Sequence, residues 1–317
     1  MPRTLAVFVL TLLVLLASPM GARAAALSPE DMETYRTAFR AVKDHRWEEA
    51  LSRAGAARDP LPRKVIAWTW YTRRGNDASF AEIADFRRDN PDWPLPWLLQ
   101  QRAEEAIKVS TPPAQLLSWY RAIDARPRTS DGALALGQAL LKAGRDAEAA
   151  DLARHAWVAH NYGRRQQSSF LRHFGRYLER EHHIERLDRL LWDGLRTSST
   201  RMFHLVGPGW KALARARVLL RHDLGGVDAA IARVPARLAD HPGLVFERVS
   251  WRRRHGHEQR AIDLLLDHPG DKGDAERWWR ERAWLARWAL DEGEPALAYR
   301  IVSEHGQSAG APLAEAE

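Results

Sequence analysis

The chain has 317 residues, of which 45% are hydrophobic and 28% are charged, and this composition is typical of folded proteins and excludes wholesale disorder. It contains no cysteine, which excludes disulfides, thiolate catalysis and cysteine-based zinc sites. The formal charge is +7, and arginines are spread along the whole sequence, which favours polyanions as partners. Solvated helix faces explain this charge equally well.

The first 24 residues have the three parts of a secretory signal peptide. Arg3 gives a positive start, residues 5–17 are almost wholly apolar, and residues 22–24 (ARA) form a small-x-small cleavage site. The apolar run is shorter than the roughly 20 residues that span a bilayer. We therefore predict a signal peptide over 1–24, a periplasmic location, and no stable membrane insertion after cleavage; an uncleaved anchor is the alternative. Export argues against nucleic acid as a partner, and cleavage leaves a formal charge of +5 because Arg3 and Arg23 are removed.

From residue 25 onward the sequence follows a helical pattern interrupted by Gly, Pro and Asp, and it lacks a sustained period-2 alternation. The breaks fall near residues 45, 75, 110, 144, 182, 222, 256 and 293. Their spacing of about 30 to 40 residues is the length of one helix–turn–helix repeat. We predict an all-α fold, an α-solenoid or superhelix of roughly eight degenerate, TPR-like helix–turn–helix pairs whose core forms only by stacking. An irregular helical bundle is the alternative.

Similar phrases begin several of these units, each with a turn residue before an acidic first turn that suits the helix dipole. They occupy 45–51, 144–150, 182–187, 256–262 and 293–299. The segment 206–210 (VGPGW) is a stronger break near the middle of the chain. We therefore expect one helical part over 25–206 and its continuation over 207–317.

The patterns that usually carry catalysis are missing or weak. Glu104 and Glu105 are adjacent on a helix and should point apart, whereas two-carboxylate glycoside hydrolysis needs facing groups. Ser168 and Ser169 lie near His173, a combination that is common by chance, and there is no Gly-x-Ser-x-Gly elbow or P-loop. The adjacent histidines lack the spacing of a helical metal site. We expect no catalytic residue, no cofactor and no metal.

Fourteen tryptophans are many for this length, and Trp offers a flat face on which a sugar ring can stack. Helical spacing more often brings such residues into the core, as the i, i+4 pair Trp284 and Trp288 illustrates. Trp278 and Trp279 are adjacent and cannot face the same way. We therefore expect one of these two side chains to be exposed.

Three phrases in the second half of the chain are similar to a known family. They are 208–217 (PGWKALARAR), 278–293 (beginning WWRER and ending ALDEG) and 298–306 (AYRIVSEHG). Together they resemble the helical N-terminal region of the soluble lytic murein transglycosylases, the Slt-type enzymes of the Gram-negative periplasm. The resemblance covers most of the chain after the signal peptide and is strongest beyond residue 205.

The resemblance implies a superhelical scaffold for peptidoglycan cleavage and turnover. In that family a lysozyme-like domain follows the scaffold and cleaves the glycan strand with a Glu in a Glu-Ser motif, before a Gly-Leu-Met-Gln motif. This chain contains neither motif, and we expect 313–317 to end within a helical element where relatives continue into further helices. No catalytic residue can therefore be carried over, and we expect the chain to be inactive alone.

The partners implied are peptidoglycan (murein) and other cell-wall enzymes. The main alternative is a standalone periplasmic helical-repeat adaptor that binds proteins; a free-standing enzyme with an unrecognised site is a weaker one. If the scaffold contacts the wall or closes into a ring, the candidate residues lie within the second and third phrases. They are Trp278, Trp279, Arg280, Arg282, Tyr299, Arg300 and His305. The competing interpretation is that these aromatics are buried and these arginines pair with glutamates between helices.

Overall fold

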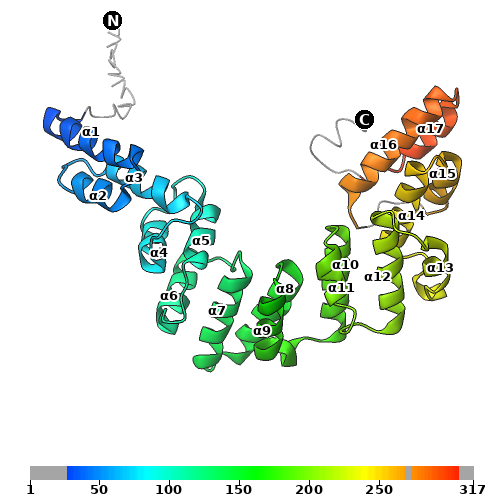
Figure 1. Ribbon diagram of the computed structural model, residues 1–317, viewed down its shortest axis with the longest axis horizontal. Helices are drawn as coiled ribbons and strands as arrows, with labels where there is room; N and C mark the ends of the chain where they lie inside the picture. The colour runs from blue at the N-terminus through cyan, green and yellow to red at the C-terminus, as the bar shows by residue number, and fades with distance from the viewer. Residues whose placement is uncertain (1–26, 269–272, 307–317) are drawn as a thin grey trace, which may run out of the picture. The chain divides into compact units, whose positions relative to one another are not determined.

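The computed structural model describes residues 27–268 and 273–306, and every regular element in them is helical (Figure 1). Seventeen α-helices and two short 3-10 turns are present in this part of the chain, which confirms the all-α, solenoid-like fold. The predicted signal peptide and the segment 313–317 lie outside the described residues. Within them, no helix has the length and apolar character needed to cross a membrane.

The described residues divide after Asn76 into two compact units. The first unit contains α1 (Pro29–Lys43), α2 (Trp47–Ala54) and α3 (Leu61–Thr72). Its core is built mainly from alanines around one tyrosine and one isoleucine, because close helix packing leaves room only for small side chains. Those residues are Tyr35, Ala38, Ala41, Ala50, Ala54 and Ile66.

The second unit contains the other fourteen α-helices of the described chain. They are α4 (Phe80–Asp89), α5 (Pro96–Glu105), α6 (Pro113–Ile123), α7 (Ser130–Lys142), α8 (Asp146–Ala159), α9 (Arg164–Phe174), α10 (Arg180–Trp192), α11 (Arg196–Arg201), α12 (Pro208–Arg221), α13 (Val227–Ala232), α14 (Pro242–Arg254), α15 (Glu258–Asp267), α16 (Ala275–Asp291) and α17 (Pro295–Val302). The 3-10 turns η1 (Gly175–Tyr177) and η2 (Ala236–Leu238) follow α9 and α13.

Contacts in the second unit follow the order of the chain. Neighbouring helices pack as pairs, such as α7 with α8, α12 with α13 and α14 with α15. Helices two positions apart also touch, as α8 does α10, α10 does α12, and α12 does α14. This nearest-neighbour stacking is the packing of a solenoid. It continues through α10, α11 and α12, so the contacts bridge the boundary expected between 206 and 207.

One turn geometry closes many of the pairs. A residue with left-handed backbone ends the helix, and the next backbone N–H donates to the carbonyl five residues before it, which is the Schellman closure. The left-handed residues are His45, Gly144, Gly194, Asp223, Gly256 and Gly293. The bonds run from Arg46 to Ala41, Arg145 to Leu140, Leu195 to Leu190, Leu224 to Leu219, His257 to Arg252 and Glu294 to Ala289, with N···O distances of 2.8 to 3.0 Å.

These turns test the breaks expected from the sequence. Those near 45, 144, 222, 256 and 293 coincide with Schellman turns, and those near 75 and 110 lie between helices. The break expected near residue 182 lies a few residues earlier, between Phe174 and Arg180, and His182 itself is in the first turn of α10. The turn of this pair is at Gly194, where the glycine permits a φ of 71°.

Candidate functional site

The wall-contact candidates on α16 are largely core residues. Trp278, Trp279 and Arg282 are exposed by only 3%, 5% and 1%. The expectation that one tryptophan of the pair is exposed is therefore wrong, since α16 is covered by more than one neighbour. Trp278 packs edge-on against Phe246 of α14, with ring centroids 5.1 Å apart, and Trp279 lies 6.0 Å from the ring of His305.

The remaining candidates do not form one surface with them. The Arg282 side chain donates to the carbonyl of Ile301 at 2.6 Å and so holds α17 against α16. Arg280 is exposed and pairs with Glu276 of its own helix. Tyr299 is exposed by 73%, and Arg300 is also exposed. Wall contact by the exposed members stays a prediction.

The adjacent carboxylates on α5 do point apart, as predicted. Glu105 is exposed and pairs with Arg102. Glu104 is buried and accepts hydrogen bonds from the backbone N–H groups of Arg128 and Thr129, at 3.0 and 2.7 Å. Burial raises the pKa of Glu104, although these bonds act in the opposite direction. Its oxygens are fully used in holding the start of α7, so it is not a free acid.

The serines near His173 form no catalytic pair. The Nδ1 atom of His173 lies 2.8 Å from the backbone oxygen of Ser169, and the hydroxyl of Ser168 donates to the carbonyl of Arg164. Over residues 27–268 and 273–306, no three His, Asp or Glu side chains gather closely enough to hold a metal ion.

Helices α10, α12, α14 and α16 are joined in series by arginine–carboxylate pairs. Such pairs stabilise only if their remaining donors and lone pairs are also satisfied, because the charges lose hydration on burial. Burial accordingly lowers the pKa of Arg217 and raises that of Glu247. The pairs are Asp188–Arg217 between α10 and α12, Glu247–Arg221 between α14 and α12 (2.7 Å), and Glu281–Arg253 between α16 and α14 (2.5 Å).

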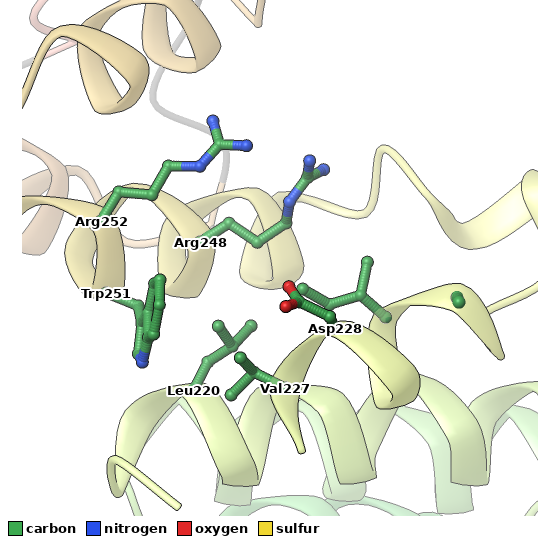
Figure 2. Close-up of a pocket in the computed structure, with 8 residues that line it drawn as sticks. Leu220, Val227, Asp228, Arg248, Trp251 and Arg252 are labelled. Carbon is green, nitrogen blue, oxygen red and sulfur yellow. The ribbon is translucent and has the colours of Figure 1, made fainter. Parts of the chain in front are cut away.

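A pocket of about 250 Å³ lies where α12, α13 and α14 meet. Figure 2 shows two guanidinium groups, those of Arg248 and Arg252, on the same side of this pocket, above Leu220 and Val227. Trp251 stands at one end and Asp228 at the other. The complete lining is Leu220, Val227, Asp228, Ile231, Ala232, Arg248, Trp251 and Arg252.

The two pocket arginines are not neutralised by the fold. Neither Arg248 nor Arg252 forms an ion pair within the described part of the chain, whereas Arg253, next in sequence, does. Arg252 donates only to the backbone oxygen of Arg260, at 2.7 Å. Burial lowers the pKa of Arg252, and the neighbouring charges of Arg248 and Arg260 lower it further. The pocket is therefore a partly desolvated cationic site, which favours an anion.

The Trp251 side chain of the pocket is held in place by His255. Its ring stacks on that of His255, with centroids 4.0 Å apart and planes at 20°. His255 in turn lies 2.9 Å from a carboxylate oxygen of Asp223, in the turn after α12. Trp251 is thus a fixed apolar wall beside two cations.

Sequence reasoning missed this site. Arg248, Trp251 and Arg252 belong to the run 247–254 (ERVSWRRR), whose arginines look like a solvated helix face. The available signal was the i, i+3 and i+4 spacing, which places the three side chains on one face of a helix. The chain matches no family model, no curated protein and no solved structure.

Proposed function

We propose that this protein is a non-catalytic helical scaffold that binds peptidoglycan in the periplasm and serves in its cleavage and turnover. The observation that carries the proposal is the arginine pocket of α14, whose two guanidinium groups lack carboxylate partners in the described chain. Peptidoglycan stem peptides carry carboxylates, which are the natural partners of such a site. The signal-peptide pattern and the resemblance to the lytic transglycosylases support the compartment and the polymer.

The segments that carry the resemblance serve helix packing. Residues 208–217 form most of α12, and Arg217 within them is buried between α10 and α14. Residues 278–293 and 298–306 supply the contact between α16 and α17, including the bond from Arg282 to Ile301. Because the resemblance is confined to residues that pack helices together, it favours a shared scaffold and assigns no catalytic residue. We therefore propose binding and no catalytic activity.

The proposal predicts that the full chain co-sediments with purified murein sacculi at low ionic strength. Binding should weaken steeply as salt rises toward about 0.5 M, because exposed charges are screened within a few ångströms there. A protein of similar size and charge but different fold serves as the control for bulk attraction. Absence of sedimentation at low salt would reject peptidoglycan as the partner.

A protein-binding adaptor is the second candidate, and a different surface favours it. Trp284, Leu290 and Tyr299 of α16 and α17 are exposed by 39%, 56% and 73%. Exposed tryptophan and tyrosine side chains are enriched in protein-binding surfaces. Soluble murein fragments should compete with sacculi if the first proposal holds. Capture of a defined cell-wall enzyme that murein fragments do not displace would instead favour the adaptor.

A further inference from the structure

We propose that the pocket between α12, α13 and α14 is a binding site for one stem-peptide residue of murein, which it holds by a carboxylate and an ammonium group. The inference rests on the proposed function and deepens it, because it assigns the recognition to one pocket and one chemical group. Three features carry it: a pair of cations without carboxylate partners in the described chain, a carboxylate on the same pocket, and an apolar floor.

The cations define the first contact. Arg248 and Arg252 are one helical turn apart on α14 and both line the pocket, and Figure 2 shows their guanidinium groups side by side on the α14 side of it. Like charges that are held close and partly buried repel each other, and a carboxylate between them removes that repulsion. Arginine binds carboxylates with charge-assisted hydrogen bonds, often two at a time. The floor below them is formed by Leu220, Val227 and Ile231.

The carboxylate opposite the cations defines the second contact. Asp228, in the first turn of α13, lines the same pocket and has no ion pair within residues 27–268 and 273–306. It forms no ion pair with Arg248, and its side chain is exposed to solvent at the edge of the pocket. A ligand that carries both an ammonium and a carboxylate group on an apolar chain matches this arrangement of charge. An uncrosslinked diamino acid of a stem peptide has that chemistry.

The size of the cavity limits the ligand. A volume of about 250 Å³ accommodates one amino-acid residue with its side chain, and the rest of a longer ligand would lie outside the open side of the pocket. Trp251 closes one end, and its stacking on His255 keeps it from turning aside. We therefore expect the peptide, rather than the glycan strand, to enter the pocket.

Isothermal titration calorimetry with a soluble murein tetrapeptide tests the site in the full-length protein. The double variant R248Q/R252Q should weaken the affinity at least about tenfold, because each charge-assisted bond contributes that order of effect. The matched control R172Q/R215Q removes two exposed charges on α9 and α12 and should leave the affinity unchanged. D228N should weaken binding of the free amine but not of the N-acetylated tetrapeptide. Circular dichroism checks that each variant folds, and R248Q alone serves if the double variant does not.

The outcomes separate this inference from the function on which it rests. Loss of peptide affinity in R248Q/R252Q alone supports the pocket. Equal loss in both double variants means bulk charge attraction and overturns it. Sedimentation of the wild-type protein with sacculi without any binding of the tetrapeptide also overturns the pocket, but leaves the proposed function standing. Failure of both assays rejects both proposals.

Discussion

Helices α4 to α8 and helices α10 to α16 hold their neighbours by opposite chemistry. In the first region, the buried carboxylate of Glu104 on α5 accepts hydrogen bonds from backbone N–H groups at the start of α7. In the second, arginines donate to carbonyls at the ends of preceding helices. These bonds run from Arg189 to Val158 (2.5 Å), from Arg221 to Trp192 (2.8 Å) and from Arg254 to Leu220 (2.9 Å).

The buried carboxylate and the arginines both supply hydrogen-bond partners to helix ends, where four N–H or four carbonyl groups lack partners in the helix itself. A carboxylate suits the positive N-terminal end and a guanidinium suits the negative C-terminal end. The region whose arginines bind helix-end carbonyls also contains the arginine pocket of α14, where we propose that a ligand binds.

The largest effect should come from breaking the arginine chemistry of the second region. Arg217→Met leaves Asp188 without its buried partner and removes the guanidinium from the face of Trp192. Loss of one member of a fully buried ion pair costs about 3–5 kcal/mol, and the cost here should lie at the lower end because Asp188 is 32% exposed. We expect the urea midpoint of the second unit to fall accordingly, whereas Arg36→Met, at an exposed pair of α1, should change little. A stability equal to that of the wild-type protein would mean that these pairs do not hold the region together.

The matching change in the first region should have a smaller effect. Glu104→Ala leaves buried donors of Arg128 and Thr129 without an acceptor, at a cost of about 1–3 kcal/mol. Glu105→Ala, one residue away and exposed, provides the control and should leave the urea midpoint unchanged. If Glu104→Ala destabilised the protein more than Arg217→Met, the first region would depend more on its buried polar contact than the second, contrary to our expectation.

The junction between α8 and α10 should weaken in acid. Burial lowers the pKa of His160 to about 4, and it also lowers that of His183, whose Nδ1 accepts the indole N–H of Trp157 at 3.0 Å. Because the folded pKa lies below the unfolded one, this stability is complete above about pH 6.5 and is lost as the pH falls toward 4. We expect Tm to drop by about 5 °C between pH 7 and pH 5.

The variant H160N/H183N isolates this contribution, since asparagine does not titrate and its oxygen can still accept from Trp157. Its Tm should be lower at pH 7 but should change less with pH than that of the wild-type protein. Parallel Tm curves for the two proteins would show that other groups cause the acid sensitivity. Glu104 and Glu247 act in the opposite sense, because their raised pKa values favour the folded state in acid.

The smallest effect should be the same in both regions, because they share one turn. Gly144 and Gly256 both have a φ of 70°, and a Cβ at either would meet no other atom within 4 Å. Alanine at either position should lower the free energy of unfolding by about 1 kcal/mol, because its side chain disfavours the left-handed backbone conformation. Thermal denaturation of G144A and G256A should give equal losses of about 2–4 °C. Unequal losses would mean that the turns are not equivalent.

The fold class was predictable because it depends on local pattern. Glycine at a left-handed position marks a turn whatever the neighbours are, so the breaks at Gly144, Gly256 and Gly293 were found from the sequence. His182 was misplaced because an acidic first turn follows both a true break and an ordinary helix start. The tryptophan pair was also misjudged: adjacent residues do face different ways on a helix, but α16 packs against α14, α15 and α17.

The candidate site was not predictable, because it depends on which arginines find partners. Arg252, Arg253 and Arg254 are consecutive, yet they reach the pocket, the carboxylate of Glu281 and the end of α12. The contacts of these three side chains are determined by how the helices pack and cannot be predicted from the residue type. A repeat of arginines at the ends of α10, α12 and α14 was visible in the sequence, and it would have predicted the carbonyl contacts but not the free pair.

Hydrogen exchange followed by mass spectrometry, with and without soluble murein fragments, tests most directly whether the arginine-rich region is the binding region. Protection is expected in peptides covering 220–232 and 248–252, which line the pocket, with no change over 80–142. Protection confined to α4–α8, or no protection anywhere at fragment concentrations that saturate binding, would contradict the assignment of ligand binding to the region of α10 to α16.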